Sequence, residues 1–552
     1  MRRKSYYLSL AAVTMLIATS VALFIPFDSE TTFDAEGDFS GTTAMIVAGD
    51  THTTALKADG TVWAWGSNNL GQLGDGTTTG RPYPVQVKAT DSTYLTNITM
   101  IAADSSNSVA LKDDGTVWTW GFNNPGQLGD GTTTNSSYPV QVKTSESVYL
   151  TNITAIAVGQ QFMIALKGDG TVWAWGYNTL GQLADGTTAH KSYATQAKTS
   201  ESTYLTNITA ISAGFNHTLA LKSGGTVWAA GYNGDGRLGD GTNTSRSYFV
   251  QVNASESTPL TGVTKIETGG RQSFALKGDG TAWAWGSNVY GQLGDGTTTD
   301  RFYPVRVKAS EHTYLENIKM IAGGENHTVA LRADGTVWAW GYNLSKQIGD
   351  GMINGTHYPV QSKSDSTTNV AGVIMIATGI NHTIVLKGDG TVWAWGSNSN
   401  GQLGDGTTTN GPYSIQTKAG DSTYLYLFTP ITGITITSEG SATTITTDDG
   451  TLQMSATMLP SDATGAVIWS VSNNNVATIN SSGLLTALSN GTVVIKATAN
   501  DGSGVFDEFE VTISGQTVSD NDDGIDPMII AVIAIIAIAA VGGAVFFLLK
   551  KK

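Results

Sequence analysis

The sequence predicts an all-β protein: a seven-bladed β-propeller, then a small β-sandwich, with an N-terminal signal segment and one C-terminal transmembrane helix. Three observations lead to this prediction. A unit of 55 residues recurs seven times, glycine accounts for 66 of 552 residues, and an uncharged apolar run precedes the C-terminal lysines. Abundant glycine together with 14 tryptophans favours many short strands joined by tight turns.

The repeat is anchored on the segment 59–66, Asp-Gly-Thr-Val-Trp-Ala-Trp-Gly, and its copies start at 59, 114, 169, 224, 279, 334 and 389. No insertion or deletion separates these anchors. The first tryptophan is present in all seven units, and the second is missing only in the fourth, where Ala230 replaces it. In the first unit we expect strands at 45–48, 53–57, 61–65 and 85–87, with an Asp-Gly hairpin turn at 58–60.

Each expected sheet has a bulky face and a small face. On the third strand Trp63 and Trp65 share one side, and Val62 and Ala64 share the other. Neither face is charged, so each sheet needs a neighbour on both sides. Stacking the units face to face satisfies this need, and seven such units can close into a ring. We therefore expect the tryptophans to lie in the core.

Three linked motifs in this unit resemble the regulator of chromosome condensation repeat: His-Thr-x-Ala-Leu-Lys, Asp-Gly-Thr-Val-Trp-Ala-Trp-Gly and Asn-x-x-Gly-Gln-Leu-Gly-Asp-Gly. The resemblance covers residues 44–428 and implies a seven-bladed propeller. It does not imply the founding member's nucleotide-exchange activity, because that activity depends on particular loops and the strict spacing leaves no room for an inserted one. We expect no GTPase partner.

After residue 428 the 55-residue period stops, and residues 429–514 alternate apolar and polar residues in strand-length runs. This pattern indicates a small β-sandwich. The segment around Leu459-Pro-Ser-Asp-Ala-Thr and Trp469-Ser-Val-Ser-Asn resembles a group 2 bacterial immunoglobulin-like domain. The resemblance implies an Ig-like stalk module of a prokaryotic surface protein, with Trp469 as its core aromatic residue. Acidic linkers are expected at 28–43 and 515–527.

The two ends of the chain predict its location. Residues 1–27 combine a basic start with an apolar run, which indicates a signal peptide or an uncleaved signal anchor. Residues 528–549 are 22 residues without charge, enough for about 33 Å of helix, and Lys550–Lys552 follow as a cytoplasmic basic stop. Because positive residues stay inside, we expect a single-pass membrane protein with the propeller and the Ig-like domain extracellular.

Composition excludes several classes of function. The chain has no cysteine, which excludes disulfides, thiolate metal sites and cysteine nucleophiles. Its net charge of −15 argues against nucleic-acid binding. The sequence contains no metalloprotease, nucleophile-elbow or phosphate-loop motif. We expect no catalytic residue, no metal site, no cofactor and no enzymatic activity.

The recurring polar residues have structural interpretations. Four histidines share one repeat position, which Asn107, Phe162 and Gln272 occupy in the other units, so a hydrogen bond at a strand start explains them better than catalysis does. They are His52, His217, His327 and His382. Asp75 and Asn68 recur in all seven units, and turn capping and loop fixing explain them better than calcium binding.

Two sets of residues are candidates for contacts outside the chain. A basic residue recurs at one position of the loop before the fourth strand, where a partner-facing segment and a solvated rim are both open interpretations. These residues are Arg81, Lys191, Arg246 and Arg301. Three Asn-Ile-Thr sequons are candidate glycosylation sites: Asn97, Asn152 and Asn207.

The function predicted from these observations is that of a surface-anchored binding or adhesion protein, whose propeller meets an extracellular protein or glycan. Three alternatives stay open: a structural component of the cell envelope, an inhibitor of a secreted enzyme, and an enzyme acting on polysaccharide. A glycosidase would need two carboxylates that converge across a cleft. The recurring aspartates instead occupy the same turn position in every unit.

Overall fold

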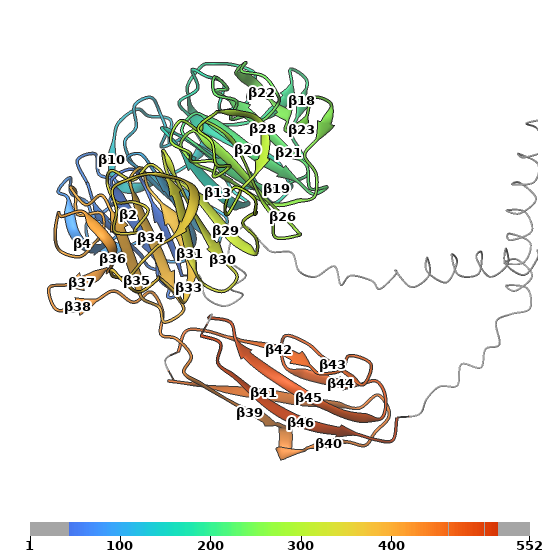
Figure 1. Ribbon diagram of the computed structural model, residues 1–552. Coiled ribbons are helices and arrows are strands. Elements are labelled where there is room, and N and C mark those ends of the chain that lie inside the picture. The colour runs from blue at the N-terminus through green and yellow to red at the C-terminus, as the bar shows by residue number, and fades with distance from the viewer. Residues whose placement is uncertain (1–43, 462, 502, 517–552) are drawn as a thin grey trace, which may run out of the picture. The chain divides into compact units, whose positions relative to one another are not determined.

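The computed structural model describes residues 44–461, 463–501 and 503–516, and Figure 1 shows them as two all-β units. The first unit holds the repeats. It contains seven four-stranded antiparallel sheets, each formed by strands in simple sequence order. The second unit contains two further four-stranded sheets. Apart from a single 3-10 turn at Glu439–Ser441, these residues form strands, turns and loops.

The first strand of each blade lines a central cavity, and the second, third and fourth strands follow outward in sequence order. The first strands are β1 (Met45–Ala48), β7 (Ile98–Asp104), β13 (Ile153–Gly159), β19 (Ile208–Ala213), β25 (Val263–Thr268), β29 (Ile318–Gly323) and β33 (Val373–Thr378). The second strands are β2 (His52–Leu56), β8 (Asn107–Lys112), β14 (Phe162–Lys167), β20 (His217–Lys222), β26 (Gln272–Lys277), β30 (His327–Arg332) and β34 (His382–Lys387).

The two outer strands of each blade carry the tryptophan motif and the strand that follows it. The third strands are β3 (Val62–Gly66), β9 (Val117–Gly121), β15 (Val172–Gly176), β21 (Val227–Gly231), β27 (Ala282–Gly286), β31 (Val337–Gly341) and β35 (Val392–Gly396). The fourth strands are β4 (Arg81–Gln86), β10 (Ser136–Gln141), β16 (Lys191–Gln196), β22 (Arg246–Gln251), β28 (Arg301–Arg306), β32 (Thr356–Gln361) and β36 (Gly411–Gln416).

The expected strands of the first unit are therefore correct to within one residue, except for the fourth. That strand starts at Arg81 rather than at 85, because Gly66 pairs with Arg81 across an irregularity in the register. Short hairpins follow the fourth strand in five blades: β5–β6 (Lys88–Thr90, Thr93–Tyr94), β11–β12 (Lys143–Ser145, Val148–Tyr149), β17–β18 (Lys198–Ser200, Thr203–Tyr204), β23–β24 (Asn253–Ser255, Thr258–Pro259) and β37–β38 (Lys418–Gly420, Thr423–Tyr424).

The second tryptophan of each motif joins its blade to the preceding one. Trp120 is fully buried, and its Nε1 donates a hydrogen bond of 2.9 Å to the Gln72 carbonyl of the preceding blade. Burial of a large indole supplies the apolar area, and the carbonyl satisfies the one polar atom of the ring. The same 2.9 Å bond recurs for Trp65, Trp175, Trp285, Trp340 and Trp395.

The seventh blade meets the first through the same contact, which closes the ring. Trp65 donates from Nε1 to the Gln402 carbonyl, and the Thr53 hydroxyl donates to that carbonyl at 2.9 Å. In Figure 1 the first blade, in blue, accordingly lies beside the last, in orange. The expectation of seven blades and of two apolar faces on each blade is confirmed.

The first tryptophan of each motif does not lie in the core as expected, because its side chain is half-buried rather than fully buried. Trp63 donates from Nε1 to the Thr61 hydroxyl at 3.1 Å, and the Lys57 ammonium lies 5.3 Å from its ring centroid. The side chain thus packs on the core with one part and binds a lysine with another. Equivalent cation–π contacts follow in the other six blades.

Blade 4, which lacks the second tryptophan, contains compensating side chains instead of a void. At Gly74 an added Cβ would lie 2.7 Å from the Trp120 Nε1, so this position requires glycine wherever the next blade has its tryptophan. Ala184 occupies this position only in the unit before Ala230. Phe249, which replaces the proline found in four other units, packs into the same buried cluster as Ala184 and Ala230.

The second unit is a two-sheet sandwich. One sheet has the order β39 (Gly433–Ser438), β41 (Thr451–Leu459), β44 (Leu484–Ala487), β43 (Ala477–Ile479). The other has the order β40 (Thr444–Ile445), β46 (Phe506–Ile513), β45 (Gly491–Ala499), β42 (Val467–Val471). Trp469 is partly buried against the core of this unit, so it covers the core instead of filling its centre.

The expected signal segment at 1–27 and the expected transmembrane helix at 528–549 lie outside the described residues. Within the described part of the chain, no helix has the length and apolar character needed to cross a membrane.

The packing of blade 4 predicts the effect of restoring its tryptophan. We expect Ala230→Trp to lower stability by about 1–3 kcal/mol, because the indole would overlap the Ala184 methyl group and Phe249. Adding Ala184→Gly and Phe249→Pro should recover most of this loss. Thermal and urea unfolding of the single, double and triple variants would measure both effects, with Ala184→Gly alone as the control. A stabilising Ala230→Trp single variant would show that the site contains a void.

Candidate binding face

One face of the propeller is built from the seven segments between the third and fourth strands, and we call it the loop face. In blade 1 this segment is 67–80. It lies at the end of the blade where β1 finishes and β2 begins, because Gly66 pairs with His52 and Thr53 pairs with Ala48. The ends of the cavity-lining strands and these loops therefore share one side of the ring.

An asparagine and an aspartate fix each loop. In blade 1 the Asn68 amide donates to the Asp75 carboxylate and to the Thr79 carbonyl, both at 3.1 Å, and its Oδ1 accepts from the Leu73 N–H at 3.0 Å. Asp75 also accepts from the Thr77 N–H and hydroxyl. The interpretation of these two residues as loop-fixing and capping side chains is confirmed. In the described residues no group of three or more His, Asp or Glu is arranged to hold a metal ion.

The four basic candidates lie beside these aspartates. Arg81 reaches Asp75 at 2.9 Å, and the equivalent pairs are Lys191–Asp185 at 3.2 Å, Arg246–Asp240 at 2.9 Å and Arg301–Asp295 at 2.5 Å. Burial raises the pKa of Asp75, but the hydrogen bonds from Thr77 and Arg81 outweigh burial and hold the pKa below its ordinary value. Each base is about a third exposed and already ion-paired within its blade. A contact with a partner stays a prediction for these four residues.

The four histidines of the shared repeat position link neighbouring blades. His52 Nε2 lies 3.0 Å from the Ser108 hydroxyl of the next blade, and His217 Nε2 lies 2.9 Å from the Ser273 hydroxyl. His327 and His382 make the same contact with threonine hydroxyls at 3.3 Å. Burial lowers the pKa of His52 to about 4, which keeps the imidazole neutral. Hydrogen bonding at a strand start is confirmed, and the partner lies in the adjacent blade.

The three sequon asparagines are exposed and have left-handed backbone conformations. Their φ angles are 61° at Asn97, 62° at Asn152 and 61° at Asn207. Gly262 and Gly372 occupy the same repeat position with φ of 70° and 69°. Asparagine and glycine tolerate this conformation best, so the backbone alone explains the residue type. Glycosylation stays a prediction.

The loop face departs from the repeat in blades 5 and 6, where apolar side chains replace polar ones. Leu344 is 63% exposed and Val289 is 57% exposed, where the first blade has Asn69. Met352 and Ile353, exposed by 60% and 53%, replace Thr77 and Thr78. We call Val289, Tyr290, Leu344, Met352 and Ile353 the apolar sector.

Direct contacts make this sector continuous. The rings of Tyr290 and Tyr342, from neighbouring blades, lie 5.0 Å apart in an edge-to-face arrangement. Asn343, which precedes Leu344, donates from Nδ2 to the Met352 carbonyl at 3.2 Å. The ring contact therefore joins the loops of blades 5 and 6, and the hydrogen bond holds together the two parts of the blade 6 loop. Exposed apolar side chains grouped in this way mark an interaction surface, whereas single ones are ordinary.

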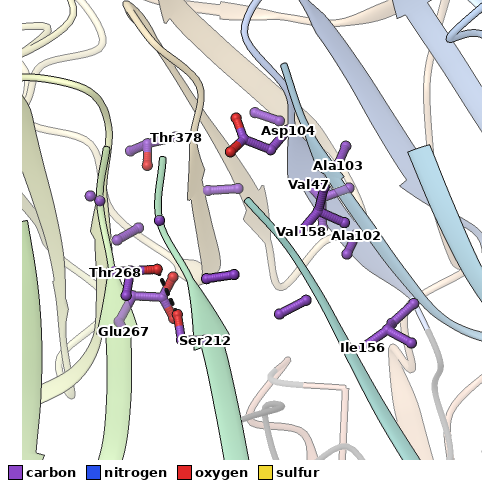
Figure 2. A pocket seen from close by; sticks show the side chains of 18 of the residues that line it. Val47, Ala102, Ala103, Asp104, Ile156, Val158, Ser212, Glu267, Thr268 and Thr378 are labelled. Atoms are coloured by element: carbon purple, nitrogen blue, oxygen red, sulfur yellow. Dashed lines mark hydrogen bonds between the residues drawn. The ribbon is translucent and has the colours of Figure 1, made fainter. Parts of the chain in front are cut away.

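The central cavity carries a second departure from the repeat. It has a volume of about 520 Å³ and is lined by the first strands of all seven blades. Asp104 stands where the six other units have glycine, and Glu267 stands where they have Val, Ala or Ser. Both carboxyls line the cavity, and Figure 2 shows them on opposite sides of it, with the Ser212–Thr268 hydroxyl pair beside Glu267. That pair is 2.8 Å apart.

Asp104 is accommodated because of a second substitution in its own blade. Gly49 occupies the repeat position of Asp104, and a Cβ added there would lie 2.2 Å from the His52 ring. At the other five glycines of this repeat position, an added Cβ would come equally close to a Phe, Gln or His side chain. Only blade 2 has an asparagine there, Asn107, which is smaller than the imidazole or phenyl ring. The two substitutions in blade 2 thus fit one another.

Sequence reasoning found neither the apolar sector nor the two cavity acids. The sequence carries a signal for most of these residues, since Val289, Leu344, Met352, Ile353, Asp104 and Glu267 differ in character from the residues at the same repeat position in most other units. Tyr290 gives no such signal, because Leu70 and Leu180 occupy its repeat position. Histidines, recurring aspartates and recurring bases are the polar candidates that the repeat pattern indicates. Apolar departures were not expected to matter, and the alternation of a strand does not show which of its faces meets a cavity.

The seven-bladed ring with a central cavity and a sandwich unit after it defines a β-propeller protein with an appended Ig-like module. The sequence matches the RCC1-like domain over residues 30–258 and 96–427, and the group 2 bacterial Ig-like domain over residues 430–509. The chain belongs to the RCC1-like domain family, and its propeller is followed by a bacterial Ig-like domain.

Relatives and solved structures agree with this assignment. The chain is 30% identical over 363 residues to the Ultraviolet-B receptor UVR8 of Arabidopsis thaliana, covering 66% of this chain and 78% of that protein. It is 29% identical to the human E3 ubiquitin-protein ligase HERC2 over 71% of this chain, which is 8% of that much longer protein. The structure of yeast RCC1 (Prp20) bound to Kap60 matches with a TM-score of 0.54 and 19% identity, over 68% of this chain and 87% of that one.

Proposed function

We propose that this protein is a cell-surface-anchored binding protein whose propeller docks a protein partner on the loop face. The apolar sector of blades 5 and 6 carries the proposal. Four of its side chains are more than half exposed, and they replace polar residues of the repeat. A protein surface with apolar anchors would remove these side chains from water, which is the usual source of affinity at the centre of an interface.

The comparisons support a role in protein binding. Propellers of this family include the yeast RCC1 that was solved in complex with Kap60. A rigid ring with short loops suits docking, because little conformational entropy is lost when its surface binds. The appended Ig-like module fits a stalk between the propeller and its anchor.

The proposed location rests on the composition of two segments, 1–27 and 528–552. We propose that residues 1–27 direct export and that residues 528–549 anchor the chain, with Lys550–Lys552 inside the cell. The propeller and the Ig-like domain would then face the exterior. The acidic segment 515–527 would tether them to the membrane.

A capture experiment tests the binding proposal. The fragment 44–516 serves as bait for surface extracts, beside a Leu344→Asp/Ile353→Asp variant. The control, Asn69→Asp/Thr78→Asp, changes the same two repeat positions in blade 1. We expect the sector variant to capture at least tenfold less partner protein than the wild type, and the control to capture the same amount as the wild type. Equal capture by all three baits would contradict docking at this sector.

Protease treatment of intact cells tests the location separately. We expect protease to release a fragment containing the propeller and the Ig-like domain, with the cut within residues 515–527, because a segment rich in Asp, Asn, Ser and Gly is an accessible site. Immunoblotting with an antibody to the propeller would detect the fragment in the medium. Degradation of the propeller only after cell lysis would place it inside the cell and overturn the proposed location.

A further inference from the structure

We propose that the central cavity is a binding site for a linear aliphatic diamine, with one ammonium group at Glu267 and the other at the Asp50–Asp104 pair. This site is distinct from the apolar sector and does not depend on the proposed protein partner. It rests on the size of the cavity, on the placement of its acids and on the apolar wall between them.

The side chains of the cavity wall are mostly small and apolar, apart from Asp50, Asp104, Glu267, Glu325 and a few hydroxyl groups, and backbone polar atoms also line the cavity. At the repeat position of Glu267 the other blades contribute small side chains: Val47, Ala102, Ala157, Ser212, Ala322 and Ala377. Small residues leave the volume of about 520 Å³ open, and their methyl groups can contact an alkyl chain. A ligand without an apolar middle would gain nothing from this wall.

The first group of acceptors lies toward the loop face. The carboxyls of Asp50 and Asp104 are hydrogen-bonded to each other, so one of them holds a proton in that bond. Burial raises the pKa of both carboxyls, and the Glu325 carboxylate also raises the pKa of Asp50. An ammonium group beside the pair would favour its ionised form. The Ser105 N–H donates to Asp50 Oδ1 at 3.2 Å and to Asp104 Oδ1 at 2.7 Å. These bonds orient the pair at the cavity mouth.

The second group of acceptors lies deeper, on the far wall. Glu267 belongs to blade 5, three blades from Asp104, which places it nearly opposite in a ring of seven (Figure 2). Its repeat position is two residues further from the loop face, or about 7 Å along the strand. The hydroxyls of Ser212 and Thr268 add two oxygens beside its carboxyl. An ammonium group has three donors, and this wall offers acceptors for them.

The cations around Glu267 have other partners, so a ligand cation does not compete with an internal ion pair. Three of these cations lie on or beside strand β25. Lys265 donates to the Lys319 carbonyl at 3.4 Å, and Arg271 pairs with Glu325 at 3.4 Å. The Lys277 ammonium lies 4.7 Å from the Trp283 ring centroid. Burial raises the pKa of Glu267 to about 8, offset only in part by a hydrogen bond from the Thr268 backbone.

This raised pKa gives the site a recognisable signature. Without a neighbouring cation, burial favours the neutral acid form of Glu267. An arriving ammonium group stabilises the carboxylate, so the carboxyl proton leaves to solvent as the diamine binds. The affinity should therefore rise as the pH increases through 8, by more than tenfold between pH 6.5 and pH 8.5.

Isothermal titration calorimetry with 1,5-diaminopentane tests the proposal on the purified full-length chain in non-ionic detergent. We expect one molecule bound per chain, with more than half a proton released at pH 7.5, measured by comparing phosphate and HEPES buffers. Glu267→Gln should weaken binding at least tenfold and abolish most of the proton release. Asp104→Gly, which restores the residue of the six other units, should weaken binding similarly but keep the release.

Matched controls separate binding in the cavity from charge attraction at the surface. Glu316→Gln removes an exposed carboxylate and should leave the affinity unchanged, and pentane-1,5-diol should give no saturable heat. Thermal unfolding would verify that each variant is folded, and Glu267→Gln should unfold at a higher temperature than the wild type because it removes a buried titratable acid. No saturable heat from the diamine with the wild type, or equal affinity in Glu267→Gln, would overturn the proposal.

Discussion

The hydrogen bond from a buried tryptophan Nε1 to a carbonyl of the preceding blade is the contact on which the rest of the structure depends. It requires a large apolar ring on one blade, and a glycine on the neighbour that lets the ring approach its backbone. Six blades make it at 2.9 Å, including the pair that joins Trp65 to Gln402 and closes the ring. The spacing between the tryptophan position and the glycine position, 65 and 74 in the first unit, is constant in all seven units, because a residue inserted between them would move either the ring or the glycine.

Departures from the repeat are compensated locally. Blade 4 loses its tryptophan, and Ala184 together with Phe249 fills the space. Blade 2 gains Asp104, and Asn107 makes room for it. Since the scaffold absorbs each change beside the residue that causes it, single blades can diverge without loss of the ring. Chemistry that must occur once in a sevenfold structure can therefore be placed in a single blade, as Glu267 illustrates, or in two neighbouring blades, as the apolar sector illustrates.

Much of the fold was predictable from the sequence, and the reasons are particular. The spacing of the tryptophan motif fixed the number of blades, and the alternation around Trp65 identified its two apolar faces. The half-buried state of Trp63 was not predictable, because alternation places it on the same face as Trp65 and does not show that Lys57 covers it. The ion pair between Arg81 and Asp75 was not predictable either, because it depends on how the loop between these two residues folds back.

The candidate sites were less predictable than the fold, because a site depends on which side chains of different blades meet. Tyr290 and Tyr342 are 52 positions apart in sequence and in contact in space. We infer that binding resides where the repeat is broken. Photo-crosslinking tests this inference, with p-benzoylphenylalanine placed in turn at Leu344, Asn69 and Ser399, which share one repeat position. We expect a discrete covalent adduct on the cell surface from position 344 and none from 69 or 399. Equal adducts from the three positions, or none from 344, would contradict it.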